Sequence, residues 1–209
     1  MQVRRTIRTE EELRAVIGEP NDVVASKIAN RLNPLTRRFI DASPFLCLAT
    51  SAPDGSCDVS PRGDPPGFVR VLDERTLLLP DRPGNRLADA LRNILQNPHV
   101  GLCFLIPGVG DSFRVNGRAT VIEDPDLLEG SAVDGRPPRL GILIEIDECY
   151  TQCSKALIRS DLWNPEHHID RAQLPSSGAI LRAIREDDFD ADTYDRERSE
   201  RYARGEGLY

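Results

Sequence analysis

The sequence predicts a mostly β protein, a small closed or nearly closed antiparallel barrel that carries helices at both ends. Three observations predict this fold. Six or seven short apolar or alternating segments follow one another through the middle of the chain, turn-forming residues separate most of them at hairpin spacing, and one helix interrupts the series at about residues 85–97. Consecutive hairpins of short strands are typical of a barrel.

The chain divides into three parts along its length. With 209 residues it is long enough to bury a core without metals or disulfides. We expect an N-terminal helical extension over 1–43, a barrel domain over 44–165 and an acidic helical tail over 166–209. The extension begins with an acidic helix start at Thr9-Glu10-Glu11-Glu12, followed by short helices over 23–32 and 35–40.

The barrel domain supplies the strands. The expected strands are, in order, 45–50, 57–60, 67–72, 76–79, 100–106, 113–122 and 140–146. The first two flank a Pro53-Asp54-Gly55-Ser56 turn, and the next two flank residues 73–75, so both pairs indicate hairpins. Gly117 is expected to interrupt the sixth strand. After the seventh strand, Tyr150–Gln152 is expected to be the junction to a helix over 153–163.

Charge and cysteine content exclude several classes of protein. The formal net charge is −7, and residues 186–209 hold nine acidic residues against four arginines, so the body is close to neutral. This balance argues against a nucleic-acid or anionic-membrane surface. The sequence has no signal-like or membrane-length apolar segment. Five cysteines without a C-x-x-C motif then predict a cytoplasmic protein with reduced thiols.

A loop rich in arginine is the first candidate site. Asp81, Arg82, Asn85 and Arg86 lie between an apolar strand and the inserted helix, with Asn85 at the expected helix N-cap and Arg86 in the first turn. Free backbone N–H groups at a helix start favour an anion, and arginines can bind its oxygens in pairs. The loop therefore predicts a phosphate site, the alternative being a solvated turn with surface arginines.

A stiff segment rich in proline and glycine is the second candidate. It contributes Ser60, Pro61, Arg62, Gly63 and Asp64. Such a segment can present backbone groups to a flat ligand, with the arginine and the aspartate adding polar specificity. The alternative is a β-bulge with a surface ion pair.

The third candidate lies in the helix after the last strand. Lys155 and Arg159 are four residues apart and share a helix face, where they could meet an anion. Trp163, the one tryptophan, either stacks on an aromatic ligand or packs in the core. Cys149 and Cys153 with His167-His168 lack a convincing metal-site pattern, so no metal is expected.

The order of these motifs resembles the pyridoxamine 5'-phosphate oxidase-like family of FMN-binding split barrels. The resemblance covers roughly residues 40–165, and residues 153–163 resemble an uncharacterised subgroup. The motifs that fall in the family's order are Ala49-Thr50, Asp54-Gly55, Gly84-Asn85-Arg86, Asn97-Pro98 and Gly117-Arg118-Ala119.

The resemblance implies a cofactor, a partner and roles for the candidate residues. It implies a homodimer with FMN at the subunit interface. Residues 60–64 would line the flavin ring, and the arginine-rich loop would hold the phosphate. Lys155, Arg159 and Trp163 would approach the flavin, either from the same chain or from the partner subunit. Arg62 or Lys155 is the candidate cation beside the ring; no general base is assigned, and the catalytic residues stay unknown.

Two departures from the oxidase bear on function. The C-terminal arginine and histidine segment that binds its substrate is missing, and Pro65 stands where the oxidase carries a basic residue. Oxidation of a vitamin B6 phosphate is therefore not expected. The resemblance implies an FMN-dependent oxidoreductase for an unidentified small molecule, the alternatives being a non-catalytic FMN or small-ligand binding or sensing module and a barrel that serves only as an interaction scaffold.

Overall fold

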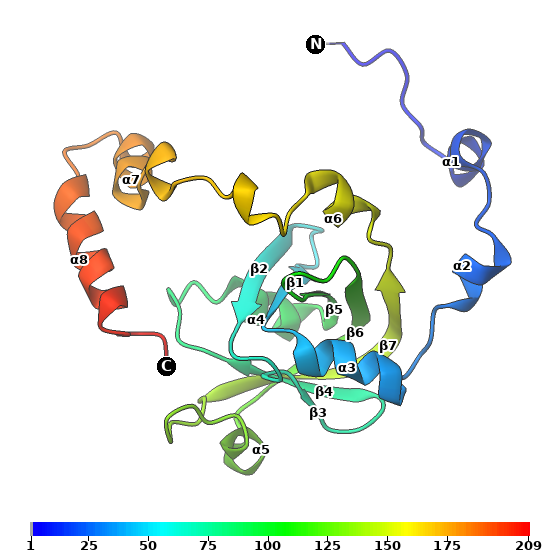
Figure 1. Ribbon diagram of the computed structural model, residues 1–209, viewed down its shortest axis with the longest axis horizontal. Helices are drawn as coiled ribbons and strands as arrows, with labels where there is room; N and C mark the ends of the chain where they lie inside the picture. Colours follow the sequence, from blue (N-terminus) through cyan, green and yellow to red (C-terminus); the bar gives the residue numbers. More distant parts are fainter. Residues whose placement is uncertain (1) are drawn as a thin grey trace.

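An antiparallel sheet of seven strands curls into a barrel at the centre of the molecule (Figure 1). The computed structural model describes residues 2–209. Neighbouring strands follow the order β2-β1-β5-β6-β7-β4-β3, so β2 and β3 form the two edges of the described sheet. The barrel is therefore split, as the family resemblance implies. The strands are β1 (Phe45–Ser51), β2 (Cys57–Gly63), β3 (Arg70–Val71), β4 (Thr76–Asp81), β5 (His99–Leu105), β6 (Ser112–Ile122) and β7 (Leu140–Gln152).

The barrel is filled by aliphatic and phenylalanine side chains from its strands. In β1 the buried residues alternate with half-buried ones, which is the period of two expected of a strand with one face in the core. Phe104 of β5 and Phe113 of β6 are buried, with ring centroids 6.3 Å apart. Each large apolar side chain buried in this way contributes about 1.5–3 kcal/mol.

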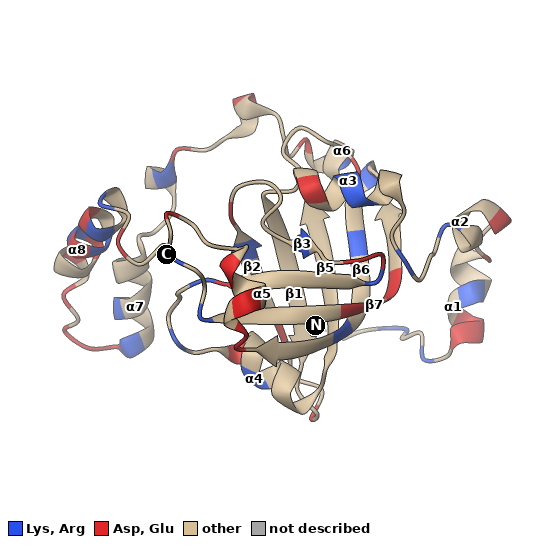
Figure 2. Ribbon diagram, turned by 90° about the horizontal axis from the view of Figure 1, so that it is seen from below, with Lys and Arg blue, Asp and Glu red and all other residues tan. Residues whose placement is uncertain are grey.

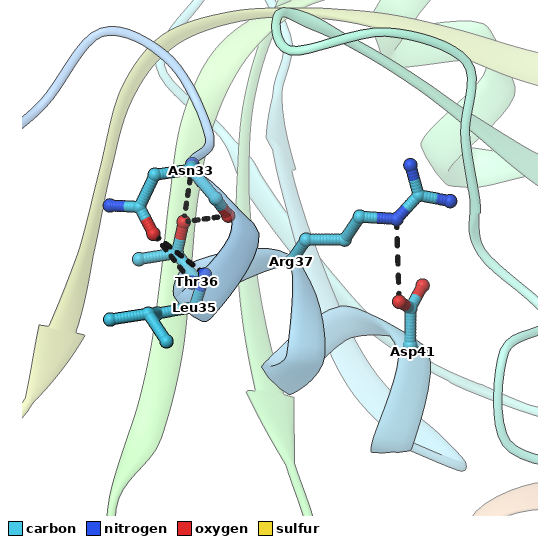
Figure 3. Close-up of polar contacts among 5 residues, drawn as sticks. All are labelled: Asn33, Leu35, Thr36, Arg37 and Asp41. Carbon is cyan, nitrogen blue, oxygen red and sulfur yellow. Dashed lines mark hydrogen bonds and ion pairs between the residues drawn. The ribbon is translucent and has the colours of Figure 1, made fainter.

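The helix α3 (Pro34–Ala42) covers part of the barrel. Asn33 caps it: its side chain accepts from the backbone N–H of Leu35 and Thr36, while the Thr36 hydroxyl bonds back to the Asn33 N–H (Figure 3). Phe39 stacks on Phe113 with ring centroids 5.7 Å apart. The expected helix over 35–40 is therefore present, and its apolar face completes the core.

The helix α4 (Asp89–Gln96) is the inserted helix. Ala90 and Ile94 are buried, and Asn93 donates a hydrogen bond to the Thr50 hydroxyl at 3.0 Å. It begins at Asp89, so the prediction that Asn85 is its N-cap is wrong. Asn85 instead accepts from the backbone N–H of Leu87 at 3.0 Å, a local turn that competes with helix formation.

A bulge in the β6–β7 pair accounts for the expected break at Gly117. Asn116 pairs with Glu148 but Gly117 pairs with Ile146, so Asp147 has no partner in this ladder and the strand continues. A Cβ on Gly117 would collide with the backbone carbonyl of Glu145. β7 also continues to Gln152, well beyond the predicted end at residue 146, because its second half pairs with the first half of β6.

The remaining helices lie outside the barrel. In both views α1 and α2 stand on one side of it and α7 and α8 on the other (Figures 1 and 2). The expected helix over 23–32 ends early, because Ala29 instead bridges to Cys149 of β7. No helix within residues 2–209 has the length and apolar character needed to cross a membrane. The outer helices are α1 (Glu10–Ile17), α2 (Asp22–Ser26), α5 (Pro125–Glu129), α6 (Lys155–Ser160), α7 (Ser177–Arg185) and α8 (Ala191–Ala203).

Candidate functional site

A cavity of about 1240 Å³ lies between β2 and the loop that leads from β4 into α4. Eight of the twelve predicted site residues line it, from two segments that are about twenty positions apart in the sequence. Four come from β2 and four from the end of β4 and its loop: Ser60, Pro61, Arg62, Gly63, Asp81, Arg82, Asn85 and Arg86.

Strand β2 presents three polar side chains to this cavity. It extends to Gly63, three residues beyond the predicted end, because residues 61–63 pair in register with the start of β1. Asp58, Ser60 and Arg62 alternate along it and therefore share one face. Arg62 Nη1 donates to Asp81 Oδ1 at 2.6 Å and its Nε donates to the Ser60 hydroxyl at 3.3 Å. These bonds fix the Arg62 guanidinium between the two segments.

A buried carboxylate lies beside the cavity. The side chain of Asp64 is 1% exposed, and its Oδ2 accepts from Arg82 Nε at 2.6 Å. Its Oδ1 accepts from the Tyr209 hydroxyl at 2.8 Å. Arg82 also donates from Nη2 to the Ser131 carbonyl at 2.9 Å. Asp64 therefore joins β2, the arginine-rich loop and the C-terminal tail.

The arginine-rich loop has an unusual backbone. Arg86 and Ala88 both have positive φ, 65° and 56°, in the left-handed region that residues other than glycine seldom adopt. Ala88 caps α4 without a side-chain hydrogen bond, so the N–H groups of the first turn are left for another acceptor. Backbone conformations of this kind are common at ligand sites, and in this chain they also occur at Asp134, Asp161 and Glu186.

Several charged groups at the cavity lack a protein partner within residues 2–209, and two of them bear most directly on ligand binding. The exposed Arg86 makes no ion pair or side-chain hydrogen bond within residues 2–209. Asp58 Oδ2 is buried without a hydrogen-bond partner. A buried carboxylate oxygen without a donor is costly, so it is a natural acceptor for a ligand N–H or O–H. Sequence reasoning missed Asp58, although its place two residues before Ser60 on a strand could have indicated it.

The comparison with protein families decides the assignment. The family model described as pyridoxamine 5'-phosphate oxidase matches residues 32–153. The chain belongs to the pyridoxamine 5'-phosphate oxidase family. Members of this family commonly bind FMN, and the family includes flavin-dependent oxidoreductases. The matched range contains the barrel and every residue that lines the cavity except Tyr209.

Solved structures with a similar backbone fold are distant from this chain in sequence. HupZ of Group A Streptococcus is 16% identical, with a TM-score of 0.48 over 59% of this chain and 95% of that one. An FMN-binding protein from Syntrophomonas wolfei is 12% identical, with a TM-score of 0.41 over 56% and 88%. A conserved hypothetical protein from Mycobacterium tuberculosis is 16% identical, with a TM-score of 0.44 over 71% and 98%. The comparison with curated proteins gave no match.

The third candidate segment, residues 155–163, lies away from the cavity. Lys155 and Arg159 are exposed on α6, and neither lines the cavity of its own chain. Trp163 is half-buried, and its Nε1 donates to the Val109 carbonyl at 2.9 Å, which ties the indole to the loop between β5 and β6. The structure of this chain therefore does not bring these three residues to the other nine.

The cysteines differ in exposure, which predicts a difference in reactivity. Burial raises the pKa of the Cys149 thiol, whereas Cys153 is exposed. Because the thiolate is the nucleophile, we expect iodoacetamide at pH 8 to alkylate Cys153 well before Cys149. Mass spectrometry of timed digests measures both rates, and equal rates would contradict the burial of Cys149.

No three His, Cys, Asp or Glu side chains within 2–209 are grouped to hold a metal ion.

Proposed function

We propose that this protein binds FMN in the cavity and is an FMN-dependent oxidoreductase acting on a small molecule. The observation that carries the proposal is the loop before α4. Its uncapped helix start, its two left-handed residues and the unpaired Arg86 all border one cavity. A helix N-terminus together with an arginine is a favourable place for a phosphate.

The remaining walls suit the rest of FMN. Pro61 and Gly63 offer a rigid backbone surface for a flat ring, and the partnerless Asp58 Oδ2 can accept a hydrogen bond from a ring N–H or a ribityl hydroxyl. The cavity exceeds the range of about 300–1,000 Å³ typical of ligand pockets. It therefore has room for both the cofactor and a small substrate.

The roles of the protein's own groups follow from this arrangement. FMN, when bound, supplies hydride or electron transfer, while the protein binds and orients it. Arg86 and the start of α4 would hold the phosphate. Arg62, fixed by Asp81 and Ser60, would place a cation beside the ligand. Lys155 lies outside this cavity, so Arg62 is the better candidate for that cation.

A homodimer is the second part of the proposal. The outer faces of β1 and β5 carry small, half-buried residues at Cys47, Ala49, Gly101 and Cys103, and the exposed Val59 lies beside them on β2. A second copy could pack closely on such a surface. It could also bring its own α6, with Lys155 and Arg159, to the cavity. Sedimentation velocity at micromolar concentration tests this, and a single monomeric species would contradict it.

The decisive experiment is spectroscopic. We expect purified protein incubated with FMN and freed of excess to keep a flavin absorption band, and titration to show saturable binding. Bleaching by NADH or NADPH and recovery in air would support the oxidoreductase. A stable band that no reductant of this kind bleaches would favour a non-catalytic FMN-binding module. Failure to retain any flavin would overturn the proposal.

A further inference from the structure

The C-terminal tail forms a helical hairpin that stands beside the barrel and returns to it at Tyr209 (Figure 1). Helices α7 and α8 hold each other: Asp195 accepts from the Gly178 N–H at 2.8 Å, and Arg198 donates to the Ser177 hydroxyl at 3.1 Å. Gly178 lies so close to α8 that a Cβ there would collide with the Ala191 carbonyl. The hairpin is therefore a unit of its own.

The segment after α8 brings a tyrosine to the cavity. Gly205 and Gly207 have φ of 68° and 77°, a conformation that glycine adopts without strain and that turns the chain back toward the barrel. Residues 205–208 are exposed, whereas Tyr209 is half-buried. The tail is thus anchored at this point by the side chain of Tyr209.

Tyr209 makes two contacts at the edge of the cavity, one with Asp64 beside it and one with Arg82 in its wall. Its hydroxyl donates to Asp64 Oδ1 at 2.8 Å, and the Arg82 guanidinium carbon lies 5.3 Å from the centre of its ring, within range of a cation–π interaction. The hydrogen bond to the Asp64 carboxylate raises the pKa of the Tyr209 phenol, because a phenolate could not donate this bond. Asp64 is almost fully buried, so the phenol satisfies an acceptor that water reaches poorly.

We propose that Tyr209 is a ligand-site residue: the docked tail closes the side of the cavity next to Arg82 and Asp64 and thereby slows the release of the bound flavin. This inference rests on the proposed function. The cavity of about 1240 Å³ remains with Tyr209 as part of its lining. Tyr209 therefore borders the cavity without filling it, so the docked tail and a ligand can be present together.

The test measures FMN release from the full-length protein by stopped-flow fluorescence. We expect Tyr209→Ala to release FMN about tenfold faster, a factor that corresponds to about 1.4 kcal/mol. Tyr209→Phe keeps the ring but loses the hydrogen bond, so its release rate should rise about threefold. Tyr202→Ala is the matched control, because Tyr202 is an exposed tyrosine of the same tail that does not line the cavity. Its release rate should equal that of the wild type.

A second measurement reports on the tail without flavin. Trypsin cleavage after the exposed Arg204 should be faster in Tyr209→Ala than in the wild type, because undocking frees the segment around it. A wild-type release rate in Tyr209→Ala would overturn the inference and leave FMN binding intact. Slower release would overturn it too, because Tyr209 would then compete with the ligand. A wild-type protein that takes up no FMN would instead defeat the proposed function, and trypsin would still show whether Tyr209 docks the tail.

Discussion

Replacing Asp64 with alanine is expected to lower the free energy of unfolding by about 3 kcal/mol, because removing one partner of a buried ion pair leaves the other charge uncompensated. The Asp64 side chain is 1% exposed and that of Arg82 is 17% exposed, with 2.6 Å between Oδ2 and Nε. The variant would leave the Arg82 guanidinium without its carboxylate partner. It would also remove the acceptor of the Tyr209 hydroxyl. Urea unfolding followed by circular dichroism, without flavin, measures the change.

Two further variants separate this cause from general damage. Asp64→Asn keeps the volume and can still accept one hydrogen bond, so its loss should be smaller. Asp41→Ala breaks the Arg37–Asp41 pair on α3, which spans 3.4 Å between side chains that are about half exposed (Figure 3). Such pairs contribute about 0–1 kcal/mol. If Asp64→Ala cost no more than Asp41→Ala, the buried pair would not stabilise the fold as inferred.

The double variant Asp64→Ala/Arg82→Ala tests the pairing directly. Because it removes both charges, it should cost clearly less than the sum of the two single variants. Agreement of the double variant with that sum to within about 0.5 kcal/mol would mean that the two side chains do not interact.

The barrel could be predicted because its signals are local. The turn at Asp54-Gly55 and the alternation of β1 depend only on nearby residues, and the structure confirms the β1–β2 hairpin that they predict. Strand ends were less predictable. β2 and β7 both continue past their predicted ends because strands distant in sequence pair with them, β1 in one case and β6 in the other. Tertiary pairing overrides local preference in this way.

The candidate site could also be predicted only in part. Arg62 and Arg82 stand in short segments whose proline and glycine content is visible locally, and the cavity brings them together. Tyr209 could not be found, because its hydrogen bond to Asp64 spans 145 positions and only the folded tail creates it. The start of α4 was misplaced because an asparagine side chain caps a helix and closes a local turn with the same hydrogen bond.

Replacing Arg86 with alanine is expected to weaken FMN binding by about 1.5–3 kcal/mol, the contribution of a hydrogen bond to a charged group, which is about 10- to 140-fold in Kd. The fold should be unaffected, since the side chain is exposed and has no ion pair within residues 2–209. Arg86→Lys should also weaken binding, because a forked donor is replaced by a point charge. Isothermal titration with FMN measures the change, and Arg38→Ala, an exposed arginine of α3 outside the cavity, is the control.

Riboflavin shows whether Arg86 acts on the phosphate. Riboflavin lacks that group, so Arg86→Ala should leave its affinity unchanged while it weakens FMN, and the ratio of the two affinities should fall toward one. Equal weakening of both ligands would assign Arg86 to the ring or the ribityl chain. If neither affinity changed, the phosphate would lie elsewhere. Arg139 would be the next candidate, since it lines the same cavity and also has no ion pair in the described part of the chain.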